Sequence, residues 1–175
     1  MKTFRVISLS VLFILTFILR AQSAPPKDPF QSLSFLEGTW EAKTDGTSGV
    51  DANGKYSFAL ELRNHVIARH MVSKESCKGP ENYDCNHSDL LYIYPEGPDQ
   101  TLHAIYFDNE GHVIRYLVST PTPTTAMFLS DSSQHGPQFR LLYERKADTM
   151  FGKFQIRMPG QSEWKSYVEW SGHKD

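Results

Sequence analysis

The chain has 175 residues, of which 39% are hydrophobic and 22% are charged, and its formal net charge at pH 7 is −2. This length fits one domain, and the composition is that of a globular protein rather than a disordered chain. A slightly acidic chain lacks the basic face that a phosphate backbone requires, so we expect no nucleic-acid partner.

The first residues have the three-part pattern of a secretory signal peptide, which we assign to residues 1–23. Lys2 and Arg5 give a positive start, a mainly apolar run follows, and Ala21 and Ser23 supply the small residues of a cleavage site. The apolar run is short for a membrane span of about 20 residues. Cleavage is therefore favoured over a retained membrane anchor.

The rest of the chain is predicted to form a linker, residues 24–29, and one domain, residues 30–172. The domain contains no second apolar stretch of membrane-spanning length. We therefore expect a secreted or periplasmic protein that is free of the membrane once the signal is removed; its oligomeric state is left open.

The domain begins with a predicted short helix, because Asp28 and Pro29 suit a helix start and Gly38 ends the segment. From there on, short stretches alternate apolar and polar residues between turn residues, which predicts about ten strands. They cover residues 38–43, 55–63, 66–74, 90–94, 101–107, 113–120, 125–130, 138–145, 150–158 and 164–170.

Turn residues separate these strands. Residues 108–111 form a four-residue hairpin connection that ends in glycine. Pro95 is expected to end its strand, because proline cannot donate to a ladder. The polar tail from Gly172 to Asp175 is expected to fray.

Hairpins that are apolar on one face must cover that face, and no helices are available to do so. The sheet must therefore pack on a second sheet or close on itself. We predict an all-β fold, an antiparallel up-and-down barrel of about ten strands with a short N-terminal helix. A Greek-key sandwich is the alternative.

The two cysteines, Cys77 and Cys85, share one Gly/Pro/Asn-rich segment. In an oxidising compartment this arrangement favours a disulfide. Zinc binding with His70 and His87 is the alternative, but four ligands at a recognised spacing are missing, so no metal is predicted. Asn86 begins an Asn-His-Ser sequon, which would be glycosylated only in a eukaryotic secretory pathway.

The segment from Phe35 to Trp40 contains Gly-x-Trp, and this start resembles that of the calycins, the lipocalin and fatty-acid-binding protein superfamily. The longer pattern, together with residues 104–112 and 165–172, is similar to exported bacterial calycin-like proteins of unknown function. The resemblance implies a barrel whose floor is closed by Trp40. Gly38 would allow the tight turn before it, so both residues are assigned structural roles.

Heme-binding nitrobindin barrels share the Gly-x-Trp start but carry a heme-ligating histidine in a C-terminal motif. Here the late histidine is His173, in a polar tail without that motif. We therefore predict no heme and no other cofactor.

The sequence contains no catalytic signature such as a Gly-x-Ser-x-Gly elbow or a zinc-binding helix. Strand alternation instead places polar side chains in an apolar lumen. On residues 66–72 the more uniformly apolar face includes His70, which is therefore predicted to point inward. The candidate ligand-binding residues are His70, Tyr106, Tyr116 and Tyr143.

The leading hypothesis is a protein that binds a small apolar or amphipathic molecule in the barrel lumen. One alternative is an acid–base enzyme, an isomerase or hydrolase, that uses His70 with the neighbouring tyrosines. A second is a surface interaction module that contacts a partner through the cysteine loop around Tyr83. In the absence of a catalytic motif, an enzyme is the less favoured class.

Overall fold

The computed structural model describes residues 28–46, 49–81, 85–131 and 136–175. The predicted signal peptide and most of the predicted linker lie outside this part of the chain.

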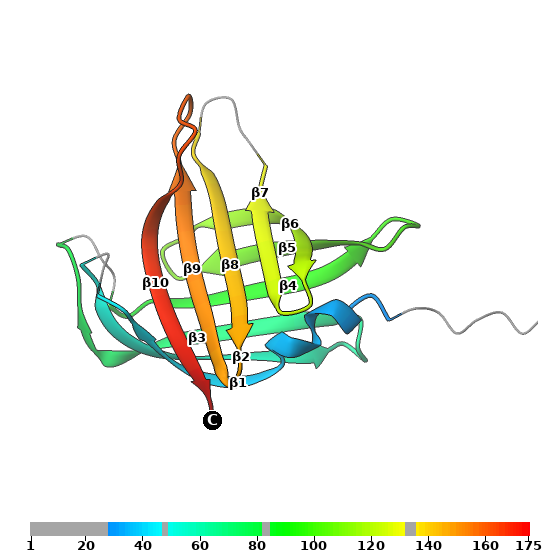
Figure 1. Ribbon diagram of the computed structural model, residues 1–175, viewed down its shortest axis with the longest axis horizontal. Helices are drawn as coiled ribbons and strands as arrows, with labels where there is room; N and C mark the ends of the chain where they lie inside the picture. Colours follow the sequence, from blue (N-terminus) through cyan, green and yellow to red (C-terminus); the bar gives the residue numbers. More distant parts are fainter. Residues whose placement is uncertain (1–27, 47–48, 82–84, 132–135) are drawn as a thin grey trace, which may run out of the picture.

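The described residues form one closed antiparallel barrel of ten strands (Figure 1). Each strand pairs with its neighbour in sequence, and the last pairs with the first, so the sheet has no free edge. This confirms the predicted all-β up-and-down barrel. The strands are β1 (Gly38–Thr44), β2 (Asp51–Glu61), β3 (Val66–Lys78), β4 (Ser88–Glu96), β5 (Thr101–Asp108), β6 (Val113–Thr122), β7 (Thr125–Ser130), β8 (Gln138–Lys146), β9 (Thr149–Arg157) and β10 (Lys165–Lys174).

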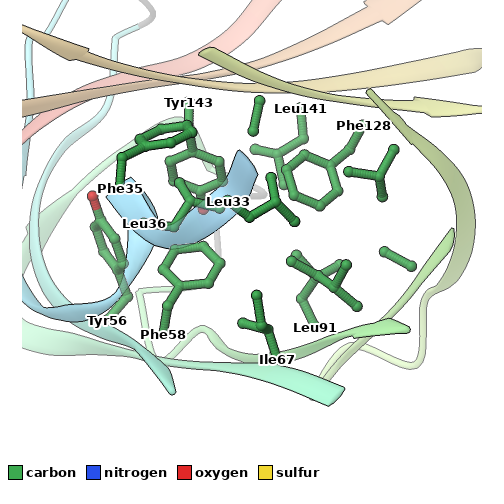
Figure 2. Close-up of a cluster of buried hydrophobic side chains, with 14 of the residues drawn as sticks. Leu33, Phe35, Leu36, Tyr56, Phe58, Ile67, Leu91, Phe128, Leu141 and Tyr143 are labelled. Atoms are coloured by element: carbon green, nitrogen blue, oxygen red, sulfur yellow. The ribbon is translucent and has the colours of Figure 1, made fainter. Parts of the chain in front are cut away.

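A short 3-10 helix, η1 (Gln31–Leu36), precedes the barrel in the segment where a helix was predicted. The Asp28 carboxylate accepts a hydrogen bond of 2.9 Å from the Phe30 N–H at its start. Leu33 and Leu36 are fully buried against the barrel, so η1 covers one of its ends (Figures 1 and 2). Among the described residues, no helix has the length and apolar character of a membrane span.

Trp40 forms the floor of the barrel at this end. Its side chain is fully buried, and its indole N–H donates a 2.9 Å hydrogen bond to the carbonyl of Leu36. Gly38, between helix and strand, has a φ of 116°, which residues with a Cβ rarely adopt. The Gly-x-Trp segment thus joins η1 to β1 and satisfies the one polar atom of the buried indole.

The half of the barrel next to η1 is packed solid with aromatic and aliphatic side chains (Figure 2). Phe58 and Tyr143 meet edge to face, with ring centroids 5.3 Å apart and an interplanar angle of 88°, a favourable arrangement for aromatic pairs. Inward-facing positions of almost every strand supply this core, among them Trp40, Phe58, Ile67, Ile93, Ala104, Val118, Phe128, Tyr143 and Met150.

Several strand ends differ from the prediction, and two of them contradict a stated expectation. Pro95 lies within β4 and pairs with Leu102 of β5, whereas it was expected to end the strand. Pairing of β4 with β3 stops at Ile93, so on that side Pro95 has no ladder in which an N–H is needed. The expected fraying from Gly172 is also wrong, because β10 continues to Lys174, which pairs with Trp40.

The last strand contains an irregularity that the alternation pattern did not reveal. The register between β10 and β9 shifts between Ser166 and Val168, and a bulge of this kind changes which residues face inward. Strict alternation along residues 164–170 would place Trp164 and Trp170 on the same face. Trp164 instead lies beside the guanidinium groups of Arg140 and Arg157, 4.3 and 4.7 Å from its ring centroid, and both arginines alternate with residues that line the lumen.

Candidate functional site

The half of the barrel opposite η1 encloses a cavity of about 430 Å³. Its lining comes from the strand ends and hairpins distant from the Trp40 floor. Most of the wall is apolar, with side chains that include Ile114, Phe139, Leu141, Phe154, Ile156 and Val168. An up-and-down barrel of ten strands is wide enough for side chains to fill one half and leave space in the other.

A buried ion pair stands in the wall of this cavity. Arg69 on β3 and Asp89 on β4 approach to 2.6 Å between Nη1 and Oδ1, and each side chain is 4% exposed. The Arg69 guanidinium also lies over the rings of Tyr56 and Tyr143, with its Cζ at 5.5 and 5.9 Å from their centroids. Two charges taken out of water in this way are tolerated only as a pair.

The pair extends to His87, just before β4. The His87 ring nitrogens lie 3.3 Å from Oδ2 of Asp89 and 3.0 Å from Oε1 of Glu110. Burial lowers the pKa of His87, but the hydrogen bonds to Asp89 and Glu110 outweigh this effect and raise the pKa above its usual range. The imidazole lies between two carboxylates, and both favour its charged form.

Further hydrogen bonds connect His87 to Tyr106 on β5. Its hydroxyl lies 3.2 Å from Nε2 of His87 and donates a 3.1 Å hydrogen bond to Asp108. Burial raises the pKa of Asp108, yet the hydrogen bonds from the His112 backbone N–H and side chain outweigh it, so this pKa is lowered. We call the connected set the polar network; it consists of Arg69, His87, Asp89, Tyr106, Asp108, Glu110 and His112.

The raised pKa of His87 predicts a pH-dependent contribution to stability. Because the folded-state pKa exceeds the unfolded value of about 6.5, the contribution is fully present below that pH. It is lost as the pH rises through the folded-state pKa. We expect the difference in unfolding free energy between wild type and His87→Gln to be constant at acidic pH and to shrink above neutrality. Urea denaturation at a series of pH values measures this difference, and one that grows with pH would contradict it.

His87, Asp108 and Glu110 could in principle hold a metal ion, since one donor atom from each lies within 4.8 Å of the others. The hydrogen bonds within the polar network already account for their closeness. A metal would bind one His87 nitrogen and would have to displace the hydrogen bond that this nitrogen makes to a carboxylate, so we assign no metal to this cluster.

Four buried side-chain polar atoms make no well-aligned hydrogen bond within the described residues. They are the Tyr56 hydroxyl, Arg69 Nε, the Tyr143 hydroxyl and Trp170 Nε1. Tyr56, Arg69 and Trp170 line the cavity, whereas Tyr143 lies in the packed half beside it. Burial raises the pKa of Tyr56 to about 12, and the hydrogen-bonding contact of its hydroxyl with the Trp170 side chain lowers this pKa by less. The Tyr56 hydroxyl is therefore an uncharged hydrogen-bonding group, as is the Trp170 indole, whereas Arg69 is charged.

The structure brings together two of the four residues predicted to bind a ligand. Tyr106 and Tyr116 line the cavity, and Tyr143 is fully buried next to it. His70, predicted to point inward, faces out; its side chain is 47% exposed and its Nε2 lies 3.1 Å from Oε1 of Glu61. The outer position of His70 corrects the predicted orientation of β3.

This error has a physical cause. The inner face of β3 is formed by Ile67, Arg69 and Met71, and the charge of Arg69 made that face look like the solvent side. Burial of Arg69 depends on Asp89, a residue of the next strand. Nothing in the spacing of the two residues reveals that pair, so the sequence reasoning missed both of them, and it named His87 only as a ligand in the zinc alternative.

The predicted disulfide is confirmed. Cys77 at the end of β3 and Cys85 are joined, with their Cα atoms 5.4 Å apart. The bridge closes the connection that leads to His87 and β4, at the same end of the barrel as the cavity. Asn86 next to it is exposed, and its glycosylation stays a prediction.

Comparisons with known proteins support the fold and no more. No protein-family model matches the chain, and no curated protein matches it in sequence. Among solved structures, the crystal structure of Rv2717c from M. tuberculosis is similar, with a TM-score of 0.54 and 11% sequence identity. The match covers 85% of this chain and 98% of that one. At such low identity the likeness shows a shared barrel fold.

Proposed function

We propose that this protein binds a small, largely apolar molecule in the open half of its barrel. The observation that carries the proposal is the cavity of about 430 Å³ with its mainly apolar wall and a polar network at one side. Ligand sites are typically cavities of roughly 300–1,000 Å³ with apolar walls and a few placed polar groups. The packed half next to Trp40 gives the cavity a rigid floor.

We further propose that the protein acts in a secreted or periplasmic location. The disulfide between Cys77 and Cys85 supports this proposal, because disulfides persist mainly in oxidising compartments.

The alternative functions have less support. In an acid–base enzyme, His70 would be the general base. This side chain faces away from the cavity, so it cannot reach a substrate bound there. His87 does face the cavity, but both of its ring nitrogens are engaged with carboxylates, which leaves no free nitrogen to take a substrate proton. Tyr83, the centre of the proposed interaction loop, lies outside the described residues.

A fluorescence titration with N-phenyl-1-naphthylamine, an apolar dye, tests the proposed function. Ala42 lines the cavity, whereas Lys43, the next residue of β1, is exposed. Ala42→Trp adds a large side chain inside the cavity, and Lys43→Trp adds the same side chain outside. We expect saturable binding at one site, weakened by about tenfold or more in Ala42→Trp, a loss of about 1.4 kcal/mol or more, and unchanged in Lys43→Trp.

Circular dichroism of both variants establishes that they fold. Dye that fails to saturate on the wild type, or that binds equally well to folded Ala42→Trp, would show that the cavity is not the binding site.

A further inference from the structure

The exposed part of the cavity lining marks its entrance. Within the described residues, four residues that line the cavity are also exposed to solvent, and the other lining residues are half-buried or buried. Three of the four, Glu110, His112 and Val113, belong to the hairpin of β5 and β6. The fourth is Tyr167 of β10, which is 48% exposed. The cavity therefore opens to solvent between this hairpin and Tyr167.

The hairpin side of the entrance is held by several hydrogen bonds. Oδ1 of Asp108 accepts hydrogen bonds from the backbone N–H groups of Glu110 and His112, at 3.0 and 2.8 Å. Oδ2 of Asp108 lies 2.9 Å from Nδ1 of His112. The Glu110 carboxylate is also bonded to His87. This side of the entrance is therefore fixed in place.

The β10 side of the entrance is held along one edge. Pairing of β10 with β1 ends at Trp170, and one further backbone hydrogen bond joins the Asp45 N–H to the carbonyl of Glu169. Residues 165–168 extend past this point and, among the described residues, pair with β9 alone. The register with β9 shifts in the same segment, and Tyr167 has no partner in that ladder. Because backbone with few hydrogen bonds opens at a low free energy, this is the side that can move.

The Tyr167 side chain lies at the boundary between the cavity and solvent. Its ring meets the ring of Phe154 edge to face, with centroids 6.0 Å apart and an interplanar angle of 88°. Phe154 lines the cavity and stacks in turn on Phe139. Burial and, to a smaller extent, the negative charge of Glu110 raise the pKa of Tyr167, so the two sides of the entrance are close enough to interact. Bulges at the rims of barrels often re-aim a side chain in this way.

We propose that Tyr167 is the gate of the cavity, and that a ligand enters and leaves when residues 165–168 move its ring away from the β5–β6 hairpin. This inference rests on the proposed lumen-binding function and adds the route to the same site. Opening breaks the contact between Tyr167 and Phe154 and leaves the packed core unchanged. A gate slows both entry and exit, whereas a side chain that only contacts the ligand affects mainly its release.

Stopped-flow fluorescence with N-phenyl-1-naphthylamine tests the gate, because it measures both rate constants. In Tyr167→Ala we expect the association rate constant to rise by about fivefold, equivalent to about 1 kcal/mol of barrier, the order of one edge-to-face contact. The dissociation rate constant should rise by at least the same factor.

Two controls isolate the effect of the ring at the entrance. Tyr167→Phe retains the ring, so it should keep the wild-type rate constants. Phe151→Ala removes an aromatic ring of similar exposure, 43%, from β9 outside the cavity lining, and it should also leave both rate constants unchanged.

A labelled variant gives a second test that remains valid if Tyr167→Ala fails to fold. The two cysteines of the chain are joined in the disulfide, so a single introduced cysteine can be labelled selectively. Tyr167→Cys carrying a polyethylene glycol maleimide should bind the dye more slowly than its unlabelled form. The same label on Phe151→Cys should have no effect.

The outcomes separate this inference from the proposed function. If Tyr167→Ala releases the dye faster but binds it at the wild-type association rate, Tyr167 is only part of the wall. The gate is then overturned while lumen binding stands, and the same holds if Phe151→Ala speeds association equally or if the label at Tyr167→Cys has no effect. If the dye does not bind the wild type, the lumen-binding function fails and the gate fails with it.

Discussion

Replacing Asp89 with asparagine is expected to lower the free energy of unfolding by about 3–5 kcal/mol, the usual effect of removing one partner of a buried ion pair. The carboxylate lies 2.6 Å from the Arg69 guanidinium, and both side chains are 4% exposed. The asparagine side chain has nearly the same shape, so packing is preserved while the charge of Arg69 loses its partner. Urea denaturation followed by tryptophan fluorescence measures the change.

The matched control is Glu144→Gln. Glu144 forms an ion pair with Lys146 at 3.0 Å, but both side chains are exposed, so the change should be at most about 1 kcal/mol. The double variant Arg69→Met, Asp89→Leu should recover most of the stability lost in Asp89→Asn, because no charge is then buried. If Asp89→Asn destabilises no more than Glu144→Gln, the pair is not buried as described.

Trp40→Ala is expected to lower the free energy of unfolding by about 3–5 kcal/mol, the range for large aromatic residues removed from a core. Trp40 is fully buried, and its indole is bonded to the carbonyl of Leu36. Its removal leaves a cavity in the core and deletes the hydrogen bond that joins β1 to η1. Thermal and urea denaturation measure the loss.

Trp164→Ala provides the comparison for this variant. Trp164 lies between Arg140 and Arg157 and is only partly buried, so its removal should cost less than about 2 kcal/mol. Because Trp40 does not line the cavity, the folded fraction of Trp40→Ala should still bind the dye with wild-type affinity. Equal destabilisation by the two substitutions would mean that Trp40 is not the floor of the core.

The barrel could be predicted from the sequence because its determinants are local. Alternation within each strand and turn residues between strands specify hairpins, as at the turn around Gly111, where φ is 90°. Since no predicted helix could cover the apolar face, the sheet had to pack on a second sheet or close on itself, and closure was the favoured choice. The Gly-x-Trp segment likewise places Trp40 at the start of the first strand.

The candidate site could not be predicted to the same extent, because it depends on contacts between strands. The inward position of Arg69 requires Asp89, 20 residues later, and a polar residue in an alternating pattern is normally read as solvent-facing. His70 was therefore assigned to the lumen in place of Arg69. The register shift after Ser166 has no sequence signal either, and strict alternation would put Trp164 on the same face as Trp170.

For the tyrosines, the inward orientation could be predicted from the sequence, but the hydrogen-bond partners could not. Tyr106 and Tyr116 lie on strands whose inner faces are marked by small or apolar neighbours such as Ala104 and Val118, and the alternation placed them in the lumen. Their hydrogen-bond partners, by contrast, come from other elements. His87 and Asp108 meet Tyr106 only because the hairpins at the open end converge.

A crystal structure of the protein soaked with 1-bromodecane tests the central claim most directly, because bromine can be located by its anomalous scattering. Lumen binding predicts an anomalous peak within the cavity, in contact with Phe154 or Ile156, and no such peak in Ala42→Trp crystals. Bromine found only on the outer surface of the barrel, or in the cavity of Ala42→Trp as strongly as in the wild type, would contradict the claim.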